Sequence, residues 1–173
     1  DGEVEDYRSK VVPGHPQYKL DWGDAPDEPY PTINAHNGAR HIVNADVFIG
    51  NKVDAEPDGQ PNITATGDDL AADDEDGVIF LNALIPGQVA QVQVTASTDG
   101  WLNAWMDFNQ DGNWSPGAEN IFSAEPLAAG VNLLSFTVPT SAVIGDRAYS
   151  RWRFSTTHNV LSPKHDPSLQ IPN

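Results

Sequence analysis

Two neighbouring stretches in the middle of the chain decide the fold, Ala90-Gln-Val-Gln-Val-Thr-Ala96 and Trp101-Leu-Asn-Ala-Trp-Met-Asp-Phe108. In the first, small and apolar residues alternate with polar ones, as expected of a strand with one buried face. Its inward residues are Ala90, Val92, Val94 and Ala96. The second predicts one face of Leu102, Ala104, Met106 and Phe108, and an opposite face of Trp101, Asn103, Trp105 and Asp107.

Further short strands are predicted on both sides of this centre. They cover Val4 to Val12, Val47 to Gly50, Val78 to Leu81, Asn120 to Ser123, Asn132 to Val138 and Tyr149 to Thr157. In the last strand we expect Trp152 and Phe154 inward, with the two arginines outward. Residues 13 to 40 are rich in Pro and Gly and predict a long structured loop. With 14 Gly, 14 Pro and no helical periodicity, the chain predicts an all-β fold, an antiparallel β-sandwich of jelly-roll type.

Composition excludes several functional classes. The 173 residues carry 25 acidic and nine basic side chains, a formal net charge of −16. This balance argues against nucleic acid as a partner, because nucleic acid requires a basic surface. No apolar stretch is long enough for membrane insertion. The chain has no Cys, which excludes thiolate catalysis and zinc–thiolate sites.

A calcium loop is predicted directly after the Trp101–Phe108 strand, in Asp107-Phe-Asn-Gln-Asp-Gly-Asn-Trp-Ser-Pro-Gly-Ala-Glu119. Asp, Asn and Asp occupy its positions 1, 3 and 5, and Gly112 at position 6 permits the sharp turn around an ion. The expected ligands are Asp107, Asn109, Asp111, the Asn113 carbonyl and Glu119. Glu119 comes one residue later than in the helical calcium loop. The alternative is an Asx-rich turn that binds nothing.

A second cation site is predicted in the acidic run from Asp54 to Asp76, which has nine carboxylates in 23 residues and no Lys or Arg. Like charges at this density repel one another unless cations neutralise them. The spacing does not identify the ligands, which we expect to be a subset of Asp54, Glu56, Asp58, Asp68, Asp69, Asp73, Asp74 and Asp76. Together the two regions predict two or more Ca²⁺ ions. The alternative is a solvated acidic loop.

An aromatic and cationic sheet face is the basis of a different hypothesis. It consists of Trp101, Trp105, Tyr149, Arg151 and Arg153, which could stack on sugar rings. The alternative is structural packing of the arginines over Trp105. No nucleophile elbow, phosphate loop or dinucleotide loop is present, so we expect no enzymatic activity.

Several longer motifs together resemble the GEVED domain family. They are Gly2-Glu-Val-Glu-Asp6 with Tyr7, Asp21-Trp-Gly-Asp-Ala-Pro-Asp27, Asn37-Gly-Ala-Arg-His41, the acidic run, Leu102 to Trp114, and Arg151-Trp-Arg-Phe-Ser155. The resemblance implies a non-catalytic extracellular module of a bacterial adhesin or surface scaffold. Neighbouring repeats of the same protein are the expected partners, and a surface glycan or protein is a further candidate. The resemblance itself does not identify a ligand. A carbohydrate-binding module is the alternative.

The resemblance also bears on domain organisation. We expect residues 1–20 to form an N-terminal strand with the GEVED motif and a connector, and residues 21–173 to form the sandwich. In the family the motif closes a domain, whereas here it opens the chain, as in one unit of a tandem array cut just before the motif. We therefore expect the strand around Tyr7 to Val12 to pair with a sandwich strand of its own or of an adjacent unit.

Overall fold

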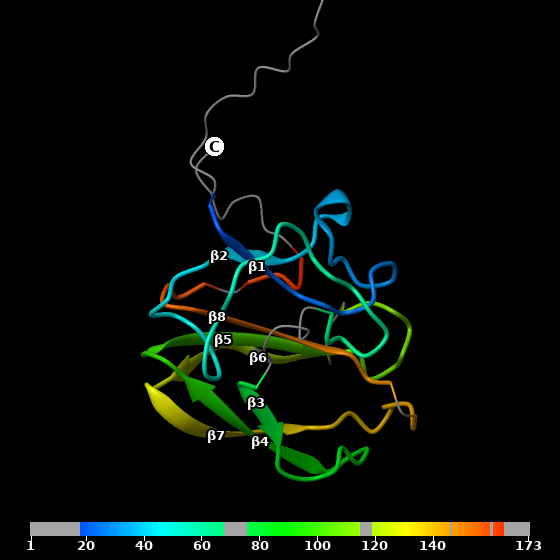
Figure 1. The fold of residues 1–173 in the computed structure, drawn as a ribbon. Coiled ribbons are helices and arrows are strands. Elements are labelled where there is room, and N and C mark those ends of the chain that lie inside the picture. Colours follow the sequence, from blue (N-terminus) through cyan, green and yellow to red (C-terminus); the bar gives the residue numbers. More distant parts are fainter. Residues whose placement is uncertain (1–17, 68–75, 115–118, 146, 160, 165–173) are drawn as a thin grey trace, which may run out of the picture.

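The structure is a computed structural model that describes residues 18–67, 76–114, 119–145, 147–159 and 161–164 (Figure 1). The predicted strand from Val4 to Val12 and its pairing lie outside the described residues. Within them, no helix is long and apolar enough to cross a membrane.

Two three-stranded antiparallel sheets form a β-sandwich. One sheet has the order β3-β4-β7, from β3 (Val78–Phe80), β4 (Val89–Ala96) and β7 (Gly130–Thr137). The other has the order β6-β5-β8, from β6 (Asn120–Leu127), β5 (Gly100–Met106) and β8 (Ser150–Ser155). The all-β antiparallel sandwich that the sequence predicts is confirmed.

The core between the sheets follows the predicted alternation. Val92 and Val94 of β4 are fully buried, as are Leu102 and Ala104 of β5. Phe136 and Phe154 complete this core from β7 and β8. Burial of apolar side chains on one face of each sheet is the main force that holds such a sandwich together.

A third layer covers the outer face of the β6-β5-β8 sheet on its β8 side (Figure 1). It is built from β1 (Leu20–Trp22), β2 (Arg40–Ile42) and the short 3₁₀ helix η1 (Asn34–His36), with the loops between residues 18 and 67. We call residues 18–67 the covering layer. β1 and β2 pair antiparallel, with Leu20 opposite Ile42.

This layer corrects the expectation of a loop throughout residues 13–40, because both short strands and η1 begin there. The domain boundary expected between residues 20 and 21 falls inside β1. Both strands are three residues long, which is too short for a periodic pattern to reveal. Their stability comes from the sheet beneath them.

Two other element predictions differ from the structure. The strand expected from Val47 to Gly50 is reduced to an isolated bridge between Ile49 and Ala96. The strand expected to end at Ser123 extends to Leu127 and includes Pro126. Because β6 is an edge strand, Pro126 removes no necessary hydrogen bond.

Candidate functional site

The end of β5 positions the predicted calcium loop. The Asp107 N–H donates to the Tyr149 carbonyl at 2.9 Å, and the Met106 N–H donates to the Glu119 carbonyl at 2.8 Å. These bonds place the loop between β6 and the segment before β8. Asp107 is therefore fully buried although it is a carboxylate.

The Asp-x-Asn-x-Asp-Gly turn is held by its own side chains. The Gly112 N–H donates to Asp107 Oδ2 at 2.9 Å, and the Asp111 N–H donates to Asn109 Oδ1 at 2.8 Å. The Asn113 N–H donates to Asp111 Oδ1 at 3.1 Å. Gly112 has a φ of 83°, a conformation that favours glycine. The turn thus has the local geometry that the spacing predicts.

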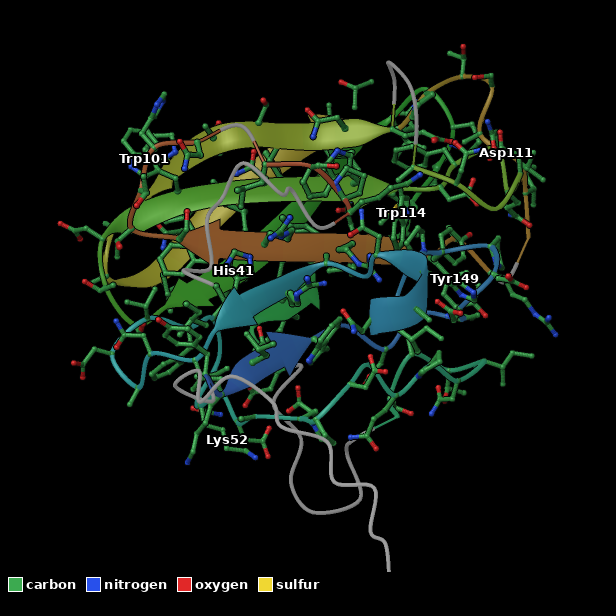
Figure 2. The ribbon with its side chains drawn as sticks, turned by 90° about the horizontal axis from the view of Figure 1, so that it is seen from above. His41, Lys52, Trp101, Asp111, Trp114 and Tyr149 are labelled. Carbon is green, nitrogen blue, oxygen red and sulfur yellow. The ribbon has the colours of Figure 1, made fainter. Side chains whose placement is uncertain are left out.

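Three carboxylates converge at this turn. Asp107, Asp111 and Glu119 each offer one oxygen, and these oxygens lie within 4.8 Å of one another. Figure 2 shows Asp111 at one end of the molecule, beside the labelled Trp114. In the described part of the chain this is the one group of three or more carboxylate or imidazole side chains close enough to hold an ion.

Glu119 is the unusual member of this group. It is 4% exposed, and its carboxylate oxygens accept no well-aligned hydrogen bond from the described residues. Weaker contacts with the backbone N–H groups of Asn109 and Phe108 only partly offset its burial. Burial, followed by the negative charges of Asp107 and Asp111, raises the pKa of Glu119 to about 7. A buried carboxylate whose hydrogen bonds are weak is costly to keep charged. A cation among the three carboxylates would remove this cost.

The covering layer contributes a residue that sequence reasoning missed. The Tyr30 hydroxyl donates to Asp107 Oδ2 at 2.5 Å, and the Tyr30 ring stacks on Trp114 at a centroid distance of 4.4 Å. Burial and the Asp107 hydrogen bond raise the pKa of Tyr30, so its hydroxyl remains a donor. No local signal near residue 30 indicates this contact, which spans 77 positions in the sequence.

The residues of the predicted second cation site do not come together where the structure describes them. Glu56 Oε2 accepts the Trp22 N–H at 3.1 Å, and Asp58 Oδ1 accepts the Asn34 N–H at 2.6 Å. Asp76 accepts hydrogen bonds from Asn51, and Asp54 is exposed. The other four candidates, Asp68, Asp69, Asp73 and Asp74, lie outside the described residues. The second site therefore stays a prediction.

The proposed sugar-binding face is covered rather than open. Trp105, Arg151 and Arg153 are all buried, with Arg153 only 3% exposed. Trp101 lies at the opposite end of the molecule from Asp111 and contacts His158 edge-on (Figure 2). Tyr149 donates its hydroxyl to the Ile63 carbonyl at 2.7 Å. These five side chains do not form one flat surface on which a sugar ring could stack.

The two arginines instead attach the covering layer to the sandwich. Arg151 Nη1 donates to the carbonyls of Pro31 and Pro163 at 2.6 and 2.7 Å, and Nη2 donates to Thr32 Oγ1 at 3.0 Å. Arg153 donates to His41 Nε2 at 2.9 Å. The sequence-based alternative of an arginine packed over Trp105 named the wrong tryptophan. The Arg151 guanidinium lies over Trp114, 4.5 Å from its ring centre.

A cavity of about 640 Å³ lies between the covering layer, β3 and β8. Its lining includes Trp22, His41, Phe80 and Trp152. The polar residue Asp24 in the lining accepts a hydrogen bond from the Gly67 N–H at 2.9 Å. Arg151 and Arg153 are committed to the bonds described above.

Comparison with known proteins supports one family. The GEVED domain model matches residues 101–168, a stretch that contains β5, the carboxylate cluster and β8. The resemblance inferred from the sequence motifs is confirmed over these residues. No curated protein and no solved structure matches the chain.

Proposed function

Because residues 101–168 carry a GEVED domain, we propose that this protein is a calcium-binding, non-catalytic repeat module of a bacterial adhesin or extracellular scaffold. Calcium is the part of the proposal that rests on geometry. The extracellular location and the repeat context rest on the family resemblance.

The observation that carries the proposal is the buried Glu119 carboxylate. A folded protein rarely keeps a buried acid without a well-aligned hydrogen-bond donor beside two other acids. Here the three oxygens lie within 4.8 Å of one another, which is close enough for one ion to contact all of them. The bond from the Gly112 N–H to Asp107 closes the turn before any ion binds, which reduces the entropy lost on binding.

The chemistry of the cluster favours Ca²⁺ over other common ions. The converging groups are carboxylates, with no His among them, which disfavours zinc. Asn109 and the Asn113 carbonyl add neutral oxygens on an irregular loop, as the larger and more flexible coordination of Ca²⁺ allows. Mg²⁺ requires a stricter octahedron and retains more of its water.

Calorimetric titration of the intact chain with Ca²⁺ tests this proposal. Asp111→Ala should abolish binding at this site, because it removes the carboxylate at position 5 of the turn. Asp46→Ala is the matched control, since Asp46 is an exposed carboxylate in a loop of the covering layer. Equal loss of binding in both variants would indicate general attraction to an acidic protein. Unchanged binding in Asp111→Ala would contradict the proposed site.

A further inference from the structure

The sandwich has four edge strands, and three of them are protected against pairing with another chain. β3 has only three residues. β6 contains Pro126 and Glu125, and its register with β5 shifts twice. β8 lies under the covering layer. Short length, proline, charge, bulges and covering segments are the devices by which native proteins block exposed edges.

Among the described residues, none of these devices protects the remaining edge, β7. It runs for eight residues, Gly130-Val-Asn-Leu-Leu-Ser-Phe-Thr137, without a charge or a proline. Of the strands that the structure describes, only β4 pairs with β7, which therefore ends its sheet on the other side. A long, uncharged edge of this kind is a template for a further strand.

The register shows which residues face the open edge. The Leu81 N–H donates to the Gln91 carbonyl at 2.8 Å and the Thr95 N–H donates to the Gly77 carbonyl at 3.0 Å, so the odd-numbered residues of β4 face β3. The even-numbered ones therefore bond to β7, where Val94 lies opposite Asn132 and Val92 opposite Leu134. Val131, Leu133 and Ser135 consequently direct their N–H and C=O groups toward the open edge.

The same residues carry an exposed apolar surface. Leu133 is 72% exposed and Val131 is 62% exposed. Leu133 lies opposite Gln93, and Gln93 lies opposite Ile79, which is 51% exposed. Apolar side chains thus lie on the outer faces of both edge strands, with the polar Gln93 of β4 between them.

Charge distribution indicates what could bind there. Residues 77–98 and 126–145, which contain the entire β3-β4-β7 sheet, include no Asp, Glu, Lys, Arg or His. The chain as a whole carries a formal charge of −16. Two copies would repel each other wherever their acidic surfaces met. Contact through this sheet brings together the parts of two copies that carry no charge.

We propose that β7 pairs antiparallel with β7 of a second copy of this chain, and that this pairing joins two β3-β4-β7 sheets into one six-stranded sheet. A two-fold axis at Leu133 places Leu133 opposite Leu133, and Val131 of each copy opposite Ser135 of the other. Every edge-facing N–H and C=O of these residues then meets a partner. The exposed leucines and valines become neighbours on one face.

Sedimentation velocity over a range of protein concentrations, at fixed calcium, tests this inference. The wild-type chain should show a reversible monomer–dimer equilibrium. Leu133→Lys should abolish it, because two lysines would meet at the axis. The matched control is Ile63→Lys, which also replaces an exposed branched apolar side chain with lysine, but in a loop outside this sheet, and should still dimerise. High salt should strengthen dimerisation, because it screens the repulsion between acidic copies.

A second variant tests the backbone pairing itself. Ser135→Pro removes an N–H that faces the open edge and leaves the bonds to β4 intact, so the variant should remain folded by circular dichroism and be monomeric. Hydrogen exchange should slow in β7 of the wild type as concentration rises. A wild-type chain that stays monomeric up to roughly 1 mM overturns the proposal. So does a folded Ser135→Pro variant that dimerises as wild type. None of these readouts depends on whether Ca²⁺ binds at Glu119.

Discussion

Glu119 provides the sharpest test at the residue scale, because its contribution to stability should change sign with calcium. In EDTA, above the folded pKa of about 7, the buried carboxylate is charged and lacks a well-aligned hydrogen-bond donor. Glu119→Gln removes that charge and should raise the free energy of unfolding by about 1–3 kcal/mol. In saturating Ca²⁺ the same change removes a ligand and should lower it. Chemical denaturation in the two conditions measures both effects.

The control for this prediction is Asp46→Asn, which removes one exposed carboxylate charge from the covering layer. It should change the free energy of unfolding little, and with the same sign in EDTA and in Ca²⁺. If Glu119→Gln destabilises the protein equally in both conditions, Glu119 is a structural residue and not a metal ligand.

The pH dependence of stability follows from the same carboxyl group. Its pKa rises from an ordinary 4.5 to about 7 in the folded, metal-free protein. Between these values the folded state holds a proton that the unfolded state has released. The free energy of unfolding in EDTA should therefore fall as pH rises through this window. Urea titrations at several pH values should show the fall in wild type and a smaller one in Glu119→Gln, and Ca²⁺ should remove the difference in slope.

At this scale the sequence predicts local geometry and misses distant partners. Asp107, Asp111 and Glu119 could be found because most of the loop lies in consecutive residues and the turn requires Gly112. Tyr30 could not, because its contact with Asp107 depends on how the covering layer lies on the sheet. The same holds for Glu56 and Asp58, whose neighbours in sequence suggested an ion and whose neighbours in space are backbone N–H groups.

At the scale of elements, Arg151 holds the covering layer to β8. Burial, together with the positive charge of Arg153, lowers the pKa of Arg151 to about 9, so the guanidinium is still charged at neutral pH. Arg151→Lys cannot supply donors to Pro31, Pro163 and Thr32 at once, since a lysine lacks the planar fork. We expect a loss of about 2–3 kcal/mol in the free energy of unfolding.

Hydrogen exchange should locate this effect. Amides of β1 and β2 should exchange faster in Arg151→Lys, while those of β4 change less, because β4 lies in the opposite sheet. Arg147→Lys is the matched control, because it makes the same substitution at an exposed arginine four residues earlier. Uniformly faster exchange, or no difference from the control, would contradict a local attachment.

How well the sequence predicts a strand depends on the length of the strand and on whether only one of its faces is buried. β4 follows its alternating pattern because one of its faces is in the core and the other is outside. For β5 and β8 the sequence predicts the core-facing residues correctly. It wrongly predicts that the opposite face is exposed, because the polar and aromatic residues there resemble a binding surface. In the structure Asn103 and Arg153 are buried through hydrogen bonds to loop carbonyls. A pattern that marks polar residues as exposed cannot anticipate such a layer.

For the whole molecule, the number of bound ions separates the two predicted sites. The loop after β5 and the acidic run together predict two or more Ca²⁺, whereas the described residues bring together a single cluster. Each ion neutralises two units of the −16 charge, so calcium should raise the melting temperature in proportion to the sites filled.

Native mass spectrometry should show two or more ions on the wild type and one fewer on Asp111→Ala. Aspartates at 73 and 74 changed together to Asn provide the comparison for the acidic run. A melting temperature that is the same in EDTA and in Ca²⁺ would count against both sites. If the wild type binds a single ion and Asp111→Ala binds none, the turn after β5 is the one calcium site and the acidic run binds no ion.

The position of the arginine attachments has a mechanical consequence. Both ends of the described chain lie on the covering-layer side of the sandwich (Figure 1). Arg151 bonds to Pro31 near one end and to Pro163 near the other. Tension applied through residues 18 and 164 would load these bonds before the two sheets. The covering layer would then separate from the sandwich and lengthen the molecule, while the two sheets stayed folded. The layer would thus act as an extensible segment in series with the sandwich.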